Sequence, residues 1–298
     1  MQTARFHSAW ITTDGSVSTS GAAGAVFPWW SFTKTVLAVA ALRLVEQGRL
    51  DLDALRPGKP YSLRQLLTHR AGVPNYGRLA AYHEAVASGE DAWSRERLLQ
   101  AVDADTLDFA PGTGWAYSNV GFMFAGEAIQ EAAGLPLGEA LQDLIIRPLG
   151  LTSPRLAVTR ADMAEVFWPH LRDYEPGWVY HGLLIGTPVD AARLLHAVLC
   201  GGFLSAASLP EMRDRFSRLG GPLPGRAVTE QAYGLGLMVG RLGEAGRAWG
   251  HNGSGPESVN LVAHFPDVAQ PITVAVFAEG EDEGAVEFEA VRIARASA

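Results

Sequence analysis

The sequence predicts an α+β fold, in which an antiparallel sheet is flanked by helices and an all-helical lobe is inserted into the chain. Short β-prone runs occur near the N-terminus, helical patterns dominate the middle, and strand-like runs return after Tyr233. The simplest arrangement is one sheet made from both chain ends. We therefore predict a sheet domain of residues 1–60 and 176–298 and an inserted helical domain of residues 61–175.

Two short strands and a buried helix are expected first. Residues 6–12 and 16–20 are β-prone and flank an Asp-Gly pair, which is a strong hairpin signal. From Ser31 an apolar run without Gly or Pro reaches Gln47 and is followed by a glycine, as at the end of a helix. This run has almost no polar face, so we expect its helix to be buried.

Helix signals recur through the middle of the chain and strand signals follow them. A Ser-Leu-Arg-Gln sequence at residues 62–65 is typical of a capping box and predicts a short helix to His69. Further helices are expected at residues 94–102, 119–133, 137–149 and 187–199, and in the tail from Gly284. Strands are expected at residues 233–239, 247–251, 258–265 and 272–278.

Ser31 and Lys34 form a candidate nucleophile and base at the start of the long helix. Residues at i and i+3 are helix neighbours, with Cβ atoms roughly 5–6 Å apart. Burial and a place in the first helical turn both favour the uncharged amine. Such an amine could take the proton of the adjacent hydroxyl, which an arginine could not do. A capping serine beside a solvated lysine is the alternative interpretation.

Two further motifs contain candidate site residues. Tyr117 and Asn119 lie two residues apart on a loop that leads into a helix, so both could point into one cleft. Packing of the tyrosine and helix capping by the asparagine are the alternatives. Near the C-terminus a strand-like run ends in residues 251–255, His-Asn-Gly-Ser-Gly. Glycines let a substrate approach the backbone, and N–H groups at a strand edge can bind an oxyanion.

The three motifs together resemble those of the serine β-lactamase and penicillin-binding-protein superfamily, most closely its class C β-lactamase-like branch of D-peptidases and esterases. The resemblance extends over roughly residues 8–280, and three ordered motifs are more specific than one. The matching segments are Ser31-Phe32-Thr33-Lys34, Tyr117-Ser118-Asn119 and His251-Asn252-Gly253, with support from residues 66–74 (LLTHRAGVP) and 148–152 (PLGLT).

The chain departs from the family pattern in two places. In the third motif Asn252 stands where Thr or Ser is usual, and His251 in place of Lys leaves no fixed cation for a substrate carboxylate. Trp29 and Trp30 precede Ser31, where smaller residues are common in the family. We expect these two tryptophans to fill the core rather than to narrow an acyl pocket.

The resemblance implies a serine acyl hydrolase in which Ser31 forms an acyl-enzyme while Lys34 and Tyr117 move protons. It places the oxyanion hole at the backbone N–H groups of Ser31 and Ser254. It also implies that Asn119 contacts Lys34 and the substrate amide. No metal and no cofactor are implied. The implied substrate-binding residues are Asn119, His251, Asn252, Gly253 and Ser254.

Small esters, amides or D-amino-acid peptides are the expected substrates. A true β-lactamase or D-Ala-D-Ala carboxypeptidase is one alternative, which the missing lysine of the third motif weakens. A catalytically silent ligand-binding homologue is another, since Asn252 and Trp30 could mark lost activity. A Ser-His-Asp hydrolase or a metal hydrolase is disfavoured, because the sequence has no Gly-x-Ser-x-Gly elbow and no His-Glu-x-x-His spacing.

The composition is that of an ordinary globular protein, with 48% hydrophobic and 19% charged residues among 298. A net charge of −8 without a basic cluster argues against nucleic-acid and membrane partners. The single cysteine, Cys200, excludes an internal disulfide and is expected to pack in the interior. The first residues do not resemble a secretory signal, so we expect a cytoplasmic location. The sequence leaves the oligomeric state open.

Overall fold

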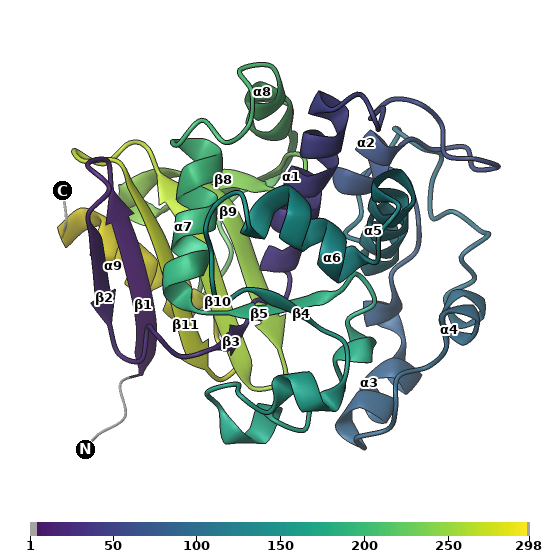
Figure 1. Ribbon diagram of the computed structural model, residues 1–298, viewed down its shortest axis with the longest axis horizontal. Coiled ribbons are helices and arrows are strands. Elements are labelled where there is room, and N and C mark those ends of the chain that lie inside the picture. The colour runs from purple at the N-terminus through teal and green to yellow at the C-terminus, as the bar shows by residue number, and fades with distance from the viewer. Residues whose placement is uncertain (1–4, 297–298) are drawn as a thin grey trace.

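The computed structural model describes residues 5–296, in which strands from both chain ends form one antiparallel sheet. In spatial order its strands are β2 (Val17–Ser20), β1 (Phe6–Thr12), β11 (Ile272–Glu279), β10 (Ser258–Phe265), β9 (Gly246–Gly255), β8 (Met238–Leu242), β7 (Val228–Tyr233) and β6 (Ser217–Gly220). Strand β1 pairs with β11 along its whole length. Figure 1 shows these purple and yellow-green strands side by side, which confirms the predicted sheet from both ends.

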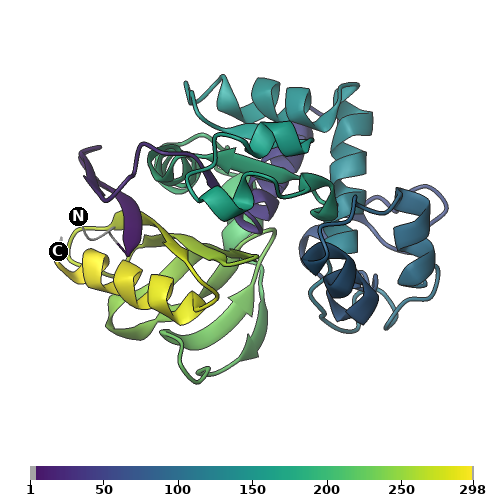
Figure 2. The same cartoon turned by 90° about the horizontal axis from the view of Figure 1, so that it is seen from below.

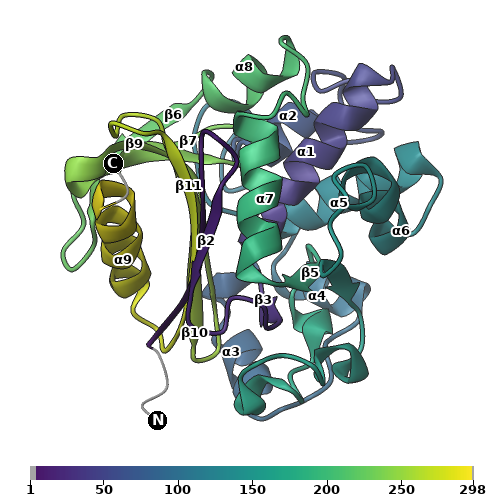
Figure 3. The ribbon, with the colours of Figure 1, turned by 60° about the vertical axis from the view of Figure 1, so that its left-hand side comes forward.

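Helices cover both faces of this sheet. Helix α9 (Glu283–Ala296) packs on one face, whereas α7 (Pro188–Leu199) and α1 (Phe32–Glu46) pack on the other. Figure 3 shows α9 and α7 on opposite sides of the strands. Every residue of β10 is buried, because a central strand covered on both faces has no solvent side.

The middle of the chain is mainly helical, as predicted. Helix α5 (Asn119–Ala133) packs against α1 and against α2 (Leu63–Leu67). Figure 2 shows these blue and teal helices on the side of the sheet domain away from α9. The other helices are α3 (Ala80–Ala87), α4 (Arg95–Ala101), α6 (Leu137–Leu141) and α8 (Ser208–Arg213).

A second, three-stranded sheet joins the two predicted domains. Strand β5 (Leu183–Gly186) pairs with β3 (Phe27–Pro28) on one side and with β4 (Arg155–Ala157) on the other. Strand β4 falls within residues 61–175, so part of the predicted insertion pairs with the predicted sheet domain. The boundary between the two domains stays a prediction.

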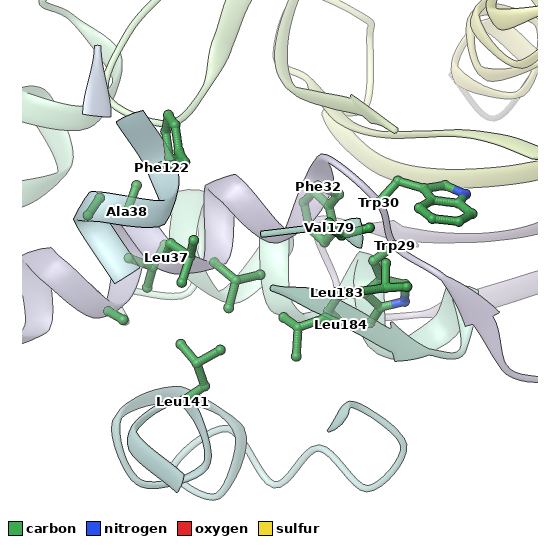
Figure 4. Packing of buried hydrophobic residues seen from close by; sticks show 14 of the residues in the cluster. Trp29, Trp30, Phe32, Leu37, Ala38, Phe122, Leu141, Val179, Leu183 and Leu184 are labelled. Carbon is green, nitrogen blue, oxygen red and sulfur yellow. The ribbon is translucent and has the colours of Figure 1, made fainter. Parts of the chain in front are cut away.

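Helix α1 is buried almost throughout, as its lack of a polar face predicts. Twelve of its 15 residues are buried, Lys34 among them. Figure 4 shows Trp29 and Trp30 at the start of this helix and Leu183 and Leu184 of β5 nearby. Both tryptophans are buried in the core, as expected, but Trp30 also contributes to the wall of a cavity. None of the described helices combines the length and apolar character needed to cross a bilayer.

The predicted strand at residues 233–239 is wrong, because a turn separates the end of β7 from the start of β8. Gly236 has a φ of 65°, and its N–H donates to the Leu67 carbonyl. Its own carbonyl accepts a hydrogen bond from the Thr35 hydroxyl at 2.7 Å. A Cβ atom on Gly236 would clash with Ala38 of α1. The turn therefore exists because α1 packs closely against the backbone here.

The predicted helix at residues 137–149 is α6 followed by a π-helical turn, Gln142–Ile146. Such a local widening leaves no mark on the apolar pattern. Strands β3, β4, β5 and β6 were not predicted, because they are too short to give a periodic signal. Strand β7 was not predicted as a separate strand, and helices α3 and α8 were also missed. The remaining predicted elements are present, with ends that differ by a few residues. The expectation that Cys200 packs in the interior is wrong, because this residue follows the end of α7 and is exposed.

Candidate active site

Ser31 is fixed at the start of α1 by the conformation and contacts of the preceding residue, Trp30. Trp30 has a φ of 43°, a left-handed conformation that is strained for a large side chain. Its indole Nε1 donates to Ser258 Oγ at 2.8 Å, and its ring lies against Gly255, where a Cβ atom would clash with it. Trp30 thus attaches the start of the helix to the end of β9 and holds Ser31 beside that strand.

The structure brings the three predicted catalytic residues into contact. Lys34 Nζ lies 3.1 Å from Ser31 Oγ, and the Tyr117 hydroxyl donates to the same oxygen at 2.9 Å. The first contact follows from the spacing of i and i+3 on a helix. The second contact depends on the tertiary fold, because Tyr117 approaches from the loop that precedes α5.

Burial favours the uncharged forms of Lys34 and Tyr117. It lowers the pKa of Lys34 well below the ordinary 10.5, and no carboxylate among residues 5–296 contributes to that pKa. Burial also raises the pKa of the Tyr117 hydroxyl, against the opposing effect of its hydrogen bond with Ser31. A neutral amine can accept a proton from Ser31, and a neutral phenol can donate one.

Three buried histidines, His69, His181 and His251, lie near Lys34. Burial is the main cause that lowers the pKa of each, and repulsion from the protonated form of Lys34 adds to it; the resulting pKa of His251 is about 3. His181 makes direct contact, with Nε2 at 3.1 Å from Lys34 Nζ. Sequence reasoning missed His181, because a single histidine before a glycine belongs to no spacing pattern.

His251 and Asn252, which were predicted to bind substrate, contact other side chains of the protein in this structure. The His251 ring is fully buried, and its Nε2 lies 3.1 Å from the Tyr233 hydroxyl. Asn252 points to the opposite face of the sheet, where its Nδ2 donates to Glu287 of α9 at 3.2 Å. Successive residues of a strand alternate between faces, so this motif can present at most one of the two side chains to a given side.

Gly253 and Ser254 lie where β9 extends beyond its neighbour β8. A Cβ atom on Gly253 would lie 2.7 Å from the Trp29 carbonyl oxygen, so glycine is needed here for β9 to pack closely against the backbone of Trp29. Ser254 pairs with Val259, one position from the Pro256-Glu257 turn. In an antiparallel hairpin, opposite residues alternate between hydrogen-bonded and non-hydrogen-bonded pairs, and the pair of Ser254 with Val259 is of the second type. The Ser254 N–H therefore points away from β10, on the side that β8 does not cover.

A cavity of about 910 Å³ opens in front of these groups. Ser31, Asn119, His181 and Ser254 contribute to its lining. The backbone N–H of Asn119 donates to Asn75 Oδ1 at 3.1 Å, whereas its side chain forms no hydrogen bond with Lys34 among the described residues. Other lining residues are aromatic, namely Trp30, Tyr76, Tyr82, Tyr174 and Trp178.

A Ser-x-x-Lys pair at the start of a buried helix, a tyrosine beside it and a strand edge opposite define the class as the serine β-lactamase and penicillin-binding-protein superfamily. Within this class the chain belongs to the Beta-lactamase family, whose sequence model matches residues 8–298. The resemblance derived from the three motifs is thereby confirmed.

Curated relatives include two esterases and a peptidase. The chain is 31% identical to the lovastatin esterase of Penicillium rubens and 33% identical to Esterase EstB of Burkholderia gladioli, over 45% and 41% of its length. It is 26% identical, over 70% of its length, to the D-alanyl-D-alanine-carboxypeptidase/endopeptidase AmpH of Escherichia coli. The matches span 40%, 36% and 59% of the lengths of these relatives.

Solved structures share the fold over nearly the whole chain. The D-amino acid amidase of Ochrobactrum anthropi superimposes with a TM-score of 0.79 at 22% identity, covering 98% of this chain and 95% of the amidase. A D-stereospecific amidohydrolase from Streptomyces gives a TM-score of 0.73 at 24% identity, covering 97% and 93%. The predicted fold class is therefore confirmed.

Proposed function

We propose that the protein is a serine hydrolase that cleaves small ester or amide substrates through an acyl-enzyme on Ser31. The observation that carries this proposal is the placement of Ser31 Oγ within hydrogen-bonding distance of Lys34 Nζ and the Tyr117 hydroxyl, at the wall of a cavity. An intact constellation of this kind also argues against a silent binding homologue. The esterase and amidase names of the relatives support the same reaction class.

In the proposed acylation, Ser31 Oγ attacks the substrate carbonyl carbon as its proton moves to the neutral amine of Lys34. The carbonyl oxygen becomes an oxyanion, which the backbone N–H groups of Ser31 and Ser254 stabilise. When the carbon–leaving-group bond breaks, the Tyr117 hydroxyl gives its proton to the leaving atom and regains one from Lys34. Water then hydrolyses the acyl ester and restores Ser31.

Intact-mass analysis tests this function. The parent protein is mixed with activated esters, a D-Ala peptide and a penicillin, and the mass gain and lifetime of each adduct are recorded. We expect short-lived acyl adducts from esters or amides, and no adduct in Ser31→Ala. A parent protein that gains no mass from any compound, although folded, would contradict the proposed acyl-enzyme.

The charges around the cavity favour substrates without a carboxylate. Arg160 is the one arginine among the described lining residues, and it pairs with Asp91 at 3.1 Å and Glu175 at 3.3 Å. The described part of the lining therefore offers no lysine and no unpaired arginine to hold a carboxylate, such as that of a D-Ala-D-Ala terminus or a penicillin. The lining carboxylates are those of Glu90, Asp173, Glu175, Glu257 and Glu281.

We expect D-alanine p-nitroanilide with a free amino group to react faster than its N-succinyl derivative. The negative field of the cavity attracts the ammonium and repels the succinyl carboxylate. The expected difference in kcat/KM is about 10-fold at low salt, and it should shrink as salt screens the exposed carboxylates. The N-acetyl derivative is the neutral control. Equal rates for all three at low salt would show that cavity charge does not select substrates.

A further inference from the structure

His181 makes the contact with Lys34 that the family resemblance implied for Asn119. Its Nε2 lies 3.1 Å and its Nδ1 3.5 Å from Lys34 Nζ. His181 is 3% exposed, and this residue precedes β5, the strand that pairs with the segment leading to Ser31. Asn119 lines the cavity nearby, but within residues 5–296 its side chain forms no hydrogen bond with the amine.

The groups that face Lys34 leave the His181 ring as an important hydrogen-bond partner for the orientation and basicity of the amine. No carboxylate is among them in the described chain, so no ion pair fixes the amine or sustains its basicity. The aromatic rings of Tyr117 and Phe122 lie 5.0 Å and 5.7 Å from Nζ and leave little room for solvent. The titratable groups around it are Tyr117, His69, His181 and His251.

We propose that His181 is a positioning residue, whose ring accepts a hydrogen bond from Lys34 Nζ and so directs the amine towards Ser31 Oγ. This inference rests on the proposed function, because the contact affects catalysis only if Lys34 activates Ser31. His181 does not touch the reacting atoms in this scheme. It acts through the lysine.

The geometry suits both protonation states of Lys34. In the neutral amine, one N–H donates to the imidazole while the lone pair is free to accept the Ser31 proton. Once Lys34 has taken that proton, the ammonium still donates to the same imidazole, and a hydrogen bond from a charged donor is the stronger one. His181 therefore stabilises the protonated lysine relative to the neutral one. It partly offsets the effect of burial and keeps the lysine basic enough to accept a proton.

The chain allows a direct test, because Lys34 and Lys59 are its two lysines. In protein labelled with ¹⁵N-lysine, the Nζ signal of Lys34 is assigned by removing the other signal with Lys59→Arg. The signal is then followed between about pH 5 and 11 in the parent, in His181→Phe and in His181→Asn. Phenylalanine keeps the ring volume without an acceptor, whereas asparagine keeps an acceptor. His196→Asn, a change on α7 at a histidine that contacts Thr273, is the matched control.

We expect the Lys34 midpoint to lie below the ordinary lysine range in the parent, and to fall by about one further pH unit in His181→Phe. His181→Asn should restore part of the shift, and the His196→Asn control should match the parent. The acidic limb of the kcat/KM profile should move in the same direction, with a plateau at least about 10-fold lower in His181→Phe. A structural defect alone would lower the plateau without moving the midpoint.

An unchanged Lys34 midpoint in folded His181→Phe would overturn the inference. If that variant does not fold, the test is made on the parent protein. The ring nitrogen signals of His181, assigned by their loss in His181→Asn, should then shift at the pH of the Lys34 midpoint. His181 signals that do not change at the Lys34 midpoint would also overturn the inference. Because these readings need no substrate, the absence of an acyl adduct on Ser31 would contradict the proposed function without deciding this one.

Discussion

Replacing Lys34 by arginine is expected to abolish nearly all ester hydrolysis, with a loss of roughly 10²–10⁴-fold. Arginine keeps much of the side-chain length but stays charged, because its pKa remains above about 12, so it cannot take the proton of Ser31. Lys34 is fully buried, and no carboxylate of the described chain stabilises its ammonium form, so the neutral amine is favoured. The measurement is the rate of p-nitrophenyl ester hydrolysis.

Matched variants separate chemistry from folding in this experiment. Lys59→Arg is the control, because Lys59 is exposed and pairs with Asp105 at 3.4 Å, so its change should leave the rate near that of the parent. Lys34→Met removes the polar amine from the buried site and should fold at least as stably, yet be as inactive as Ser31→Ala. Thermal unfolding establishes that each variant is folded. A folded Lys34→Arg protein that hydrolyses the ester at a rate within a few-fold of the parent would contradict the Ser–Lys mechanism.

The parts of the site that are close in sequence could be predicted from sequence alone. Ser31 and Lys34 needed only helix spacing and an apolar run to be placed together and buried. Strand β10 was bounded correctly because a turn with proline precedes it and a Pro-Asp pair follows it. Tyr117 was placed by its motif, since no local rule brings its hydroxyl to a serine 86 positions away.

The rest depended on tertiary contacts that leave little trace in the sequence. His181 meets Lys34 because β5 pairs with β3, and strands of two and four residues carry no readable period. The motif 251–253 was expected to present several side chains to the substrate, but strand alternation sends His251 and Asn252 to opposite faces. The turn at Gly236 was missed because its cause is the neighbouring backbone of α1.

Ser254 provides a second test with a large expected effect, since the proposal gives a role to its backbone and none to its side chain. Ser254→Pro removes the N–H that would bind the oxyanion, and loss of one such donor costs about 10²–10³-fold in kcat. Ser254→Ala keeps the N–H and should retain most of the activity. The two variants change the same position, so they separate the donor from the hydroxyl.

The pairing of β9 also indicates that the proline variant will fold. Ser254 lies opposite Val259 in a pair of the type without hydrogen bonds, and β8 pairs with β9 no further than Gly250, so proline at this edge removes no ladder bond. Thermal unfolding should therefore give similar midpoints for Ser254→Pro, Ser254→Ala and the parent, while p-nitrophenyl ester hydrolysis collapses in the proline variant alone. Full activity in folded Ser254→Pro would remove Ser254 from the oxyanion hole, whereas equal losses in both variants would assign the effect to the hydroxyl.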